Sequence, residues 1–200
     1  SRPTSKCPTT SCKSLIVRVS GGTGMRLIGI DPGLQRTGWG VLAMEGSRLS
    51  HLGHGVIVSD PKLPLAERLR QLYQGLTNLL VQWQPVEAAV EETFVNKNPT
   101  STLKLGQARG VLLLAPAMAS IPVAEYSPNL IKKSVVGTGH AQKAQVAMMV
   151  TTLLPTAGAV IGDAADALAV AICHAHLRRN RQIIAQAAGT NGRLRRKVGA

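Results

Sequence analysis

The stretch LIGIDPG (residues 27–33) is a short apolar run that stops at an acid and a turn. Such a run, bounded by Pro-Gly, is typical of a buried strand. A second apolar run, residues 88–90, ends in the same way at two glutamates, and two aspartates open an Ala-rich segment further on. Acids at the ends of buried elements suggest a cation site. The acids that we expect to form it are Asp31, Glu91, Asp163 and Asp166.

Around this stretch, hydrophobic periodicity predicts an α/β fold. Three strands, at 26–31, 37–45 and 48–58, are expected to form an antiparallel meander, and two more are expected at 86–92 and 121–126. Helices are expected at 64–84, 101–119, 128–136, 141–153 and 163–180. This order predicts a five-stranded mixed sheet flanked by helices.

The charge of the chain points to a polyanionic partner. Its 200 residues include 23 Lys and Arg against 10 Asp and Glu, so the net charge is +13. Nucleic acid is the leading candidate, and an acidic membrane surface is the lesser one. The sequence has no apolar run of transmembrane length, so no membrane association is expected. Three cysteines without CxxC spacing argue against a disulfide framework or a zinc site, which predicts a reduced, cytoplasmic protein.

The composition divides the chain into three parts. Residues 1–24 are basic, rich in Ser and Thr, and free of acids, so we expect a disordered extension, with a transit peptide as the alternative. Residues 25–180 are expected to form the single folded domain. Residues 181–200 are expected to form a mobile basic tail.

Asp163 and Asp166 lie at positions i and i+3 of the last predicted helix, so they share one face. One interpretation is helix capping, because acids favour a helix N-terminus. The other is metal binding, which gains weight if Asp31 and Glu91 converge on this terminus. Two Mg²⁺ ions between such carboxylates could activate water and stabilise the leaving oxygen of a phosphodiester. Ser, Cys and His do not gather in a triad-like context, so water is the expected nucleophile.

Several motifs, taken together, resemble the RuvC family of Holliday-junction resolvases over residues 25–180. GIDPG alone is shared with actin-like ATPases, so the two longest motifs carry most of the resemblance. The matching motifs are GIDPG (29–33), TGWG (37–40), VEETF (90–94), LKLGQARG (103–110), VVG (135–137) and DAADALA (163–169).

The resemblance implies an RNase H-like fold and a homodimer that resolves four-way DNA junctions in recombination and repair. It implies Mg²⁺-dependent, paired symmetric nicks that leave 5′-phosphate and 3′-hydroxyl ends, with two ions per site and Mn²⁺ able to substitute. A RuvA–RuvB branch-migration complex would be the partner. The implied catalytic and metal-binding residues are Asp31, Glu91, Asp163 and Asp166.

The resemblance also implies DNA contacts. Lys132 and Lys143 match basic positions beside the scissile phosphate, although solvated helix positions are the alternative. Phe94 matches an aromatic that contacts an unstacked base, and a core position is the alternative. Lys104 and Arg109 are plausible phosphate contacts, with surface solvation as the rival.

Three further expectations concern the periphery of the site and the helices. Glu92 stands where relatives often have Gln, so it is expected to support the cluster. His174 and His176 are interpreted as basic surface. The second half of helix 101–119 is apolar on all sides, which predicts cover by a partner subunit.

Three other functions compete with the resolvase interpretation. An RNA-processing nuclease of the related YqgF type usually has a shorter chain than this one. An actin-like ATPase or kinase needs a second lobe, for which this chain is too short. A non-catalytic junction-binding protein would not need all four acids.

Overall fold

The computed structural model describes residues 24–93 and 98–197, with side chains described up to Asn180. Its sheet has five strands in the order β3-β2-β1-β4-β5. The strands are β1 (Met25–Asp31), β2 (Arg36–Glu45), β3 (Arg48–Val58), β4 (Glu87–Glu91) and β5 (Val123–Tyr126). The helices are α1 (Leu65–Trp83), α2 (Pro99–Met118), α3 (Pro128–Val136), α4 (Lys143–Leu153) and α5 (Asp163–Lys197), with a short 3-10 turn, η1 (Pro155–Ala157).

The mixed character of the sheet confirms the predicted fold class. β1, β2 and β3 pair antiparallel as a meander, whereas β4 is parallel to β1 and β5 is parallel to β4. The register places Ile30 opposite Val90, so β1 and β4 end side by side. The acids that follow these two residues therefore emerge at the same end of the sheet.

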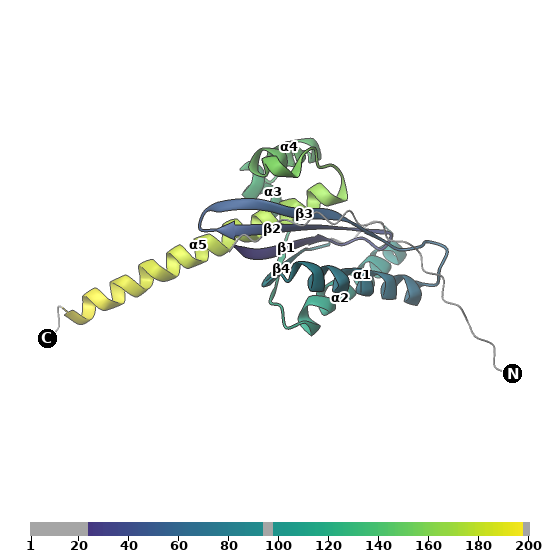
Figure 1. Cartoon of the computed structure of the whole chain (residues 1–200), viewed down its shortest axis with the longest axis horizontal. Coiled ribbons are helices and arrows are strands. Elements are labelled where there is room, and N and C mark those ends of the chain that lie inside the picture. Colours follow the sequence, from purple (N-terminus) through teal and green to yellow (C-terminus); the bar gives the residue numbers. More distant parts are fainter. Residues whose placement is uncertain (1–23, 94–97, 198–200) are drawn as a thin grey trace.

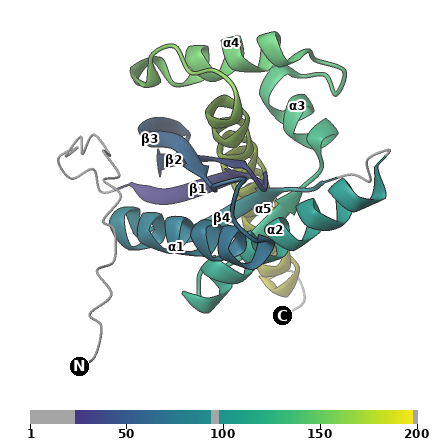
Figure 2. The same cartoon turned by 90° about the vertical axis from the view of Figure 1, so that its right-hand side faces the viewer.

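Helices cover both faces of the sheet (Figure 1). α1 and α2 lie on one face, where Leu72, Leu76 and Leu112 pack against Ile28 and Ile30. α5 lies along the other face, and α3 and α4 pack against α5 (Figure 2). Both faces are buried as a result, which explains why the central strands are continuous apolar runs.

α5 approaches the sheet at backbone distance. A Cβ at Gly29 of β1 would lie 2.5 Å from the backbone nitrogen of Ala171, and one at Gly40 of β2 would lie 2.6 Å from Leu168. The helix presents alanines at this contact, including Ala167. Small residues on both elements therefore set the spacing between α5 and the sheet.

Two helix boundaries differ from the sequence prediction. α2 begins at Pro99, because Asn98 caps it by accepting from the backbone N–H groups of Thr100 and Ser101, so Ser101 is not the cap. α5 continues to Lys197 instead of ending near Asn180. The mobility expected for residues 181–200 and the disorder expected for residues 1–24 stay predictions, since those segments lie largely outside the described side chains.

His174 corrects another expectation, because it is buried and not part of a basic surface. Its ring nitrogens lie 2.8 Å from the Tyr126 hydroxyl and 2.9 Å from Glu87 Oε2. Arg178 also donates to Glu87, at 2.7 Å. Burial alone would raise the pKa of Glu87, but the hydrogen bond and charge of Arg178, with His174, outweigh it and lower that pKa. The network ties α5 to β4 and β5.

The second half of α2 is only partly covered. Leu112 and Ala115 are buried against the sheet and α1, whereas Leu114 and Met118 are 52% and 68% exposed. The described part of the chain contains no helix that is both long and apolar enough to cross a membrane.

Candidate active site

Asp31 and Glu91 lie next to each other at the ends of parallel neighbouring strands. Their side chains are hydrogen-bonded, and both residues are partly buried. Burial, followed by the charges of Glu91, Asp166 and Asp163, raises the pKa of Asp31 to about 8. Burial, followed by the charge of Asp166, raises the pKa of Glu91 to about 7. The contributions of these neighbouring charges show that the carboxylates lie near one another.

The start of α5 brings Asp163 and Asp166 to the same place. Gly38 pairs with Asp31 across β1 and β2, and a Cβ at Gly38 would fall on the backbone carbonyl of Asp163. Only glycine at this position lets the first turn of α5 lie against β2 beside Asp31. The structure thus brings all four predicted acids together, although they are far apart in the sequence.

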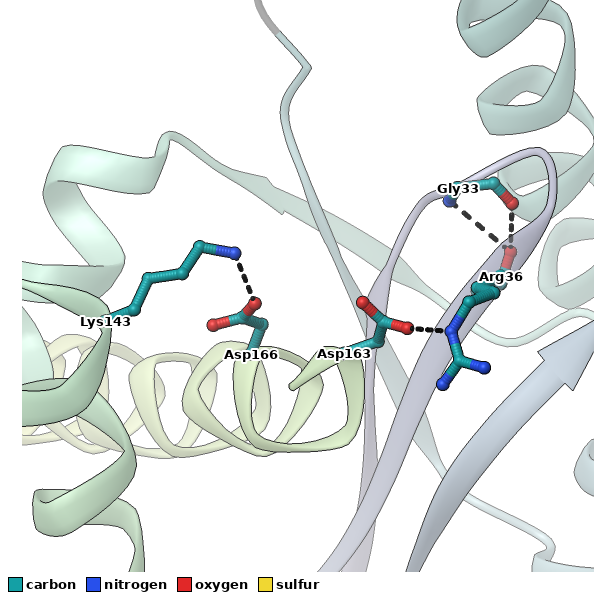
Figure 3. Close-up of polar contacts among 6 residues, drawn as sticks. Gly33, Arg36, Lys143, Asp163 and Asp166 are labelled. Atoms are coloured by element: carbon teal, nitrogen blue, oxygen red, sulfur yellow. Dashed lines mark hydrogen bonds and ion pairs between the residues drawn. The ribbon is translucent and has the colours of Figure 1, made fainter. Parts of the chain in front are cut away.

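Two cations hold the aspartates from opposite sides (Figure 3). Arg36 Nε donates to Asp163 Oδ2 at 2.7 Å, and Lys143 Nζ donates to Asp166 Oδ2 at 3.1 Å. The hydrogen bond and charge of Asp166 raise the pKa of Lys143. Lys143 comes from α4, whereas Arg36 comes from the start of β2, so the acid cluster lies between them.

The donor set fits a hard divalent cation. All four side chains offer carboxylate oxygens, the ligands that Mg²⁺ prefers. Among the side chains that the structure describes, no three Asp, Glu, His or Cys groups are already arranged around one point as metal ligands. Asp163 and Asp166 turn instead to Arg36 and Lys143. Cation binding at these aspartates would therefore require an exchange of partners.

The predicted DNA contacts fall into three groups. Lys132 and Lys143 lie beside the acids, since the charges of both lower the pKa of Glu91 against the larger effect of burial. Lys104 is exposed on α2. Phe94 lies outside the described residues, so its role stays a prediction.

Arg109 is engaged within the protein. Its Nε donates to the backbone carbonyl of Glu91 at 3.3 Å, and its Nη2 forms an ion pair with Glu125 of β5. The side chain of Arg109 is 21% exposed. It braces the end of β4 under Glu91, and its predicted contact with a DNA phosphate stays a prediction. Glu92 is partly exposed, and its backbone N–H donates to the carbonyl of Tyr126 at 2.9 Å.

Sequence reasoning missed Arg36, although a signal was present. The residue lies three positions after the end of GIDPG and two positions before Gly38. The turn itself is braced, because Thr37 Oγ1 donates to the Gly33 carbonyl at 2.7 Å. A cation in a turn that ends beside Asp31 must lie near the acids.

Comparisons with known proteins agree with this site. A family model described as crossover junction endodeoxyribonuclease RuvC matches residues 27–174. A protein of that name from Rhodospirillum rubrum is 59% identical over 169 residues, which cover 84% of this chain and 100% of the relative. One from Caulobacter vibrioides is 59% identical over 159 residues, covering 79% and 94% of the two chains.

Solved structures give the same result. The structure of T. thermophilus RuvC in complex with a Holliday junction substrate is 36% identical, with a TM-score of 0.73, and the match covers 78% of this chain and 95% of that one. The yeast mitochondrial Holliday junction resolvase Ydc2 is 17% identical, with a TM-score of 0.57 and coverage of 82% and 86%. This second likeness supports the fold alone.

Proposed function

The chain belongs to the RuvC family of crossover junction endodeoxyribonucleases, and on this premise we propose which of its residues cut a four-way DNA junction. It is a Holliday-junction resolvase and therefore a phosphodiester hydrolase that acts on DNA. The family is one of metal-dependent nucleases. We assign the cutting to Asp31, Glu91, Asp163 and Asp166, with two Mg²⁺ ions, for which Mn²⁺ can substitute.

The observation that carries this assignment is the convergence of acids from three elements at one end of the sheet. Asp31 and Glu91 share a hydrogen bond, and their pKa values respond to the charges of the α5 aspartates. Carboxylates confined so closely repel one another unless cations lie among them. A structural role such as helix capping explains Asp163 and Asp166 but gives no reason for Asp31 and Glu91 to face them.

The bound ions would lower the pKa of a water molecule and stabilise the leaving oxygen. The chain supplies the rest. The partly buried carboxylates of Asp31 and Glu91 lie at the strand ends, and Asp163 and Asp166 complete the site from α5. Lys143 and Lys132 place positive charge where a scissile phosphate would lie. In-line attack by water would leave a 5′-phosphate and a 3′-hydroxyl.

We propose in addition that the chain acts as a homodimer through α2. Leu103, Leu114 and Met118 of this helix are 66%, 52% and 68% exposed, which is unusual for large apolar side chains of one helix. A twofold dimer would match the near-twofold symmetry of a four-way junction, so that two sites nick opposed strands. By family analogy, a RuvA–RuvB branch-migration complex would deliver the junction during recombination and repair.

The assignment is tested with Glu91→Gln and Asp166→Asn, and with Glu67→Gln as a control. Glu67 is an exposed acid on α1, paired with Arg70, so its replacement makes the same change in charge away from the cluster. Each protein is assayed on a synthetic four-way junction and on a linear duplex, with Mg²⁺ and with EDTA. The site variants should bind the junction nearly as well as wild type but cut it about a hundredfold more slowly.

Two results would contradict the proposal. If both site variants cut the junction at the wild-type rate with Mg²⁺, the acids have been assigned wrongly. If the linear duplex is cut as fast as the junction, the enzyme does not select for structure. The control variant should resemble wild type in both assays.

A further inference from the structure

Arg36 is a cation inside the acid cluster that the mechanism above does not use. Its guanidinium Nε lies 2.7 Å from Asp163 Oδ2, on the side of the cluster opposite to Lys143 (Figure 3). The contact joins the start of β2 to the start of α5, elements 127 residues apart in the sequence. It therefore depends on the same fold that assembles the acids.

The backbone that carries Arg36 is fixed on every side. Arg36 pairs with Val58 at the end of the β2–β3 ladder, and the carbonyl of Gln35 accepts from the Ser59 N–H at 3.0 Å. The Ser59 hydroxyl donates to the carbonyl of Leu34 at 2.5 Å. The backbone of Arg36 is therefore held in place, whereas its long side chain can still rotate.

The ion pair itself is open to solvent. The side chain of Arg36 is 58% exposed and that of Asp163 is 34% exposed. Ion pairs at such positions contribute little to stability. Nor is Arg36 needed to hold α5 against β2, because Gly38 already brings β2 to the backbone of Asp163. A merely structural role does not account for the contact.

We propose that Arg36 is a displaceable counter-ion of Asp163, which leaves the carboxylate when a divalent cation binds and then contacts a phosphate of the junction. This inference rests on the proposed metal site. An oxygen that accepts from Arg36 cannot offer the same lone pair to a metal, so the guanidinium and the metal compete for Asp163.

A phosphate is the natural second partner of the released guanidinium. Arginine binds phosphate oxygens through two parallel N–H donors, and it cannot lose its charge at physiological pH. Lys143 and Arg36 lie on opposite sides of the Asp163–Asp166 pair (Figure 3). A strand whose scissile phosphate lies over the acids would therefore meet one cation on each side, and Arg36 would hold the neighbouring phosphate.

The competition is tested first without DNA, by calorimetric titration of Mg²⁺ into metal-free protein. Arg36→Gln should bind Mg²⁺ about two- to fivefold more tightly than wild type, the range set by an exposed ion pair. Arg70→Gln is the matched control, because it removes one charge from an exposed pair on α1 and should leave Mg²⁺ binding unchanged. Thermal unfolding confirms that each variant is folded.

The phosphate contact is tested by junction binding over a series of KCl concentrations in Ca²⁺, which tolerates irregular coordination better than Mg²⁺. Loss of one phosphate contact should reduce the slope of log affinity against log salt by about 0.9 in Arg36→Gln. Arg70→Gln should keep the wild-type slope. In EDTA, where Asp163 retains the guanidinium, the difference between Arg36→Gln and wild type should shrink.

Equal Mg²⁺ affinity in wild type and Arg36→Gln would overturn the competition, and an unchanged salt slope would overturn the phosphate contact. Asp163→Asn separates this inference from the metal site itself. If Asp163→Asn loses Mg²⁺ binding while Arg36→Gln binds Mg²⁺ no more tightly than wild type, only the role of Arg36 is wrong. If Asp163→Asn binds Mg²⁺ as wild type does, the proposed metal site fails, and the inference fails with it.

Discussion

Replacing Asp31 with asparagine should stabilise the metal-free protein at neutral pH while abolishing cleavage. Burial and then the charges of Glu91, Asp166 and Asp163 raise the pKa of Asp31 from 3.8 to about 8. At neutral pH the carboxyl therefore keeps its proton in the folded protein and loses it in the unfolded chain. Folding takes up a proton, so stability is full below about pH 4 and falls as the pH rises towards 8.

The structure sets a ceiling on the effect. At pH 7 the cost covers the interval from 3.8 to 7, which at about 1.4 kcal/mol per pH unit is roughly 4 kcal/mol. Asp31 is partly exposed and shares its proton with Glu91, so we expect Asp31→Asn to raise the free energy of unfolding by only about 1–2 kcal/mol. For a domain of this size the melting temperature would rise by about 2–8 °C. Asparagine can still donate to Glu91, as the protonated acid does.

Thermal unfolding in EDTA, followed by circular dichroism, measures the gain at about pH 5, 7 and 8. The gain should increase with pH, because only the wild-type protein loses the contribution of Asp31 over this range, whereas the raised pKa of Glu91 is expected to act in both proteins. Glu67→Gln is the control, and it should change stability by less than about 0.5 kcal/mol at any of these pH values. A variant no more stable than wild type at neutral pH, or a gain that does not depend on pH, would refute the raised pKa of Asp31 and the reasoning from burial and neighbouring charge.

Two further predictions concern residues that position the acids. Gly38→Ala places a Cβ on the Asp163 carbonyl, so α5 must shift. We expect stability to fall by about 1–3 kcal/mol and the cleavage rate to fall about a hundredfold. A cleavage rate near that of wild type would show that the close contact is not needed. Arg109→Ala removes the brace under Glu91, so the cleavage rate should fall about tenfold with little change in junction affinity. A weaker affinity with a reduced salt slope would instead restore Arg109 as a phosphate contact.

Much of the fold could be predicted because its signals are local. Apolar runs and leucine spacing indicated every strand and α-helix of the described chain, and the boundaries differ by only a few residues except at the end of α5. Caps were harder, because Asn98 and Ser101 are both good capping residues and only the backbone path decides between them. The meander and the mixed character of the sheet followed from the order of the elements.

The acids of the candidate site could be predicted because Asp31 and Glu91 end recognisable strands and Asp163 and Asp166 open a recognisable helix. Lys132 and Lys143 could be placed near them through the family resemblance, but Arg36 was missed. The pairing of Arg36 with Asp163 depends on how β2 meets α5, and the position of Arg36 between GIDPG and Gly38 was the one available signal. His174 was misjudged for another reason. It lies near two arginines in the sequence, but its spacing of three from Ala171 and seven from Ala167 places it on the face that packs against the sheet.

The contact between α5 and the glycines of β1 and β2 affects how precisely the acids of the strand and the helix are spaced. Where a helix meets a sheet through long side chains, each chain can change rotamer and let the layers drift by a fraction of an ångström. Here main-chain atoms meet almost directly at Gly29, so no torsional freedom lies between the strand that carries one acid and the helix that carries two. The spacing on which phosphodiester cutting depends is consequently built into the polypeptide backbone, and thermal repacking elsewhere in the core should leave it unchanged.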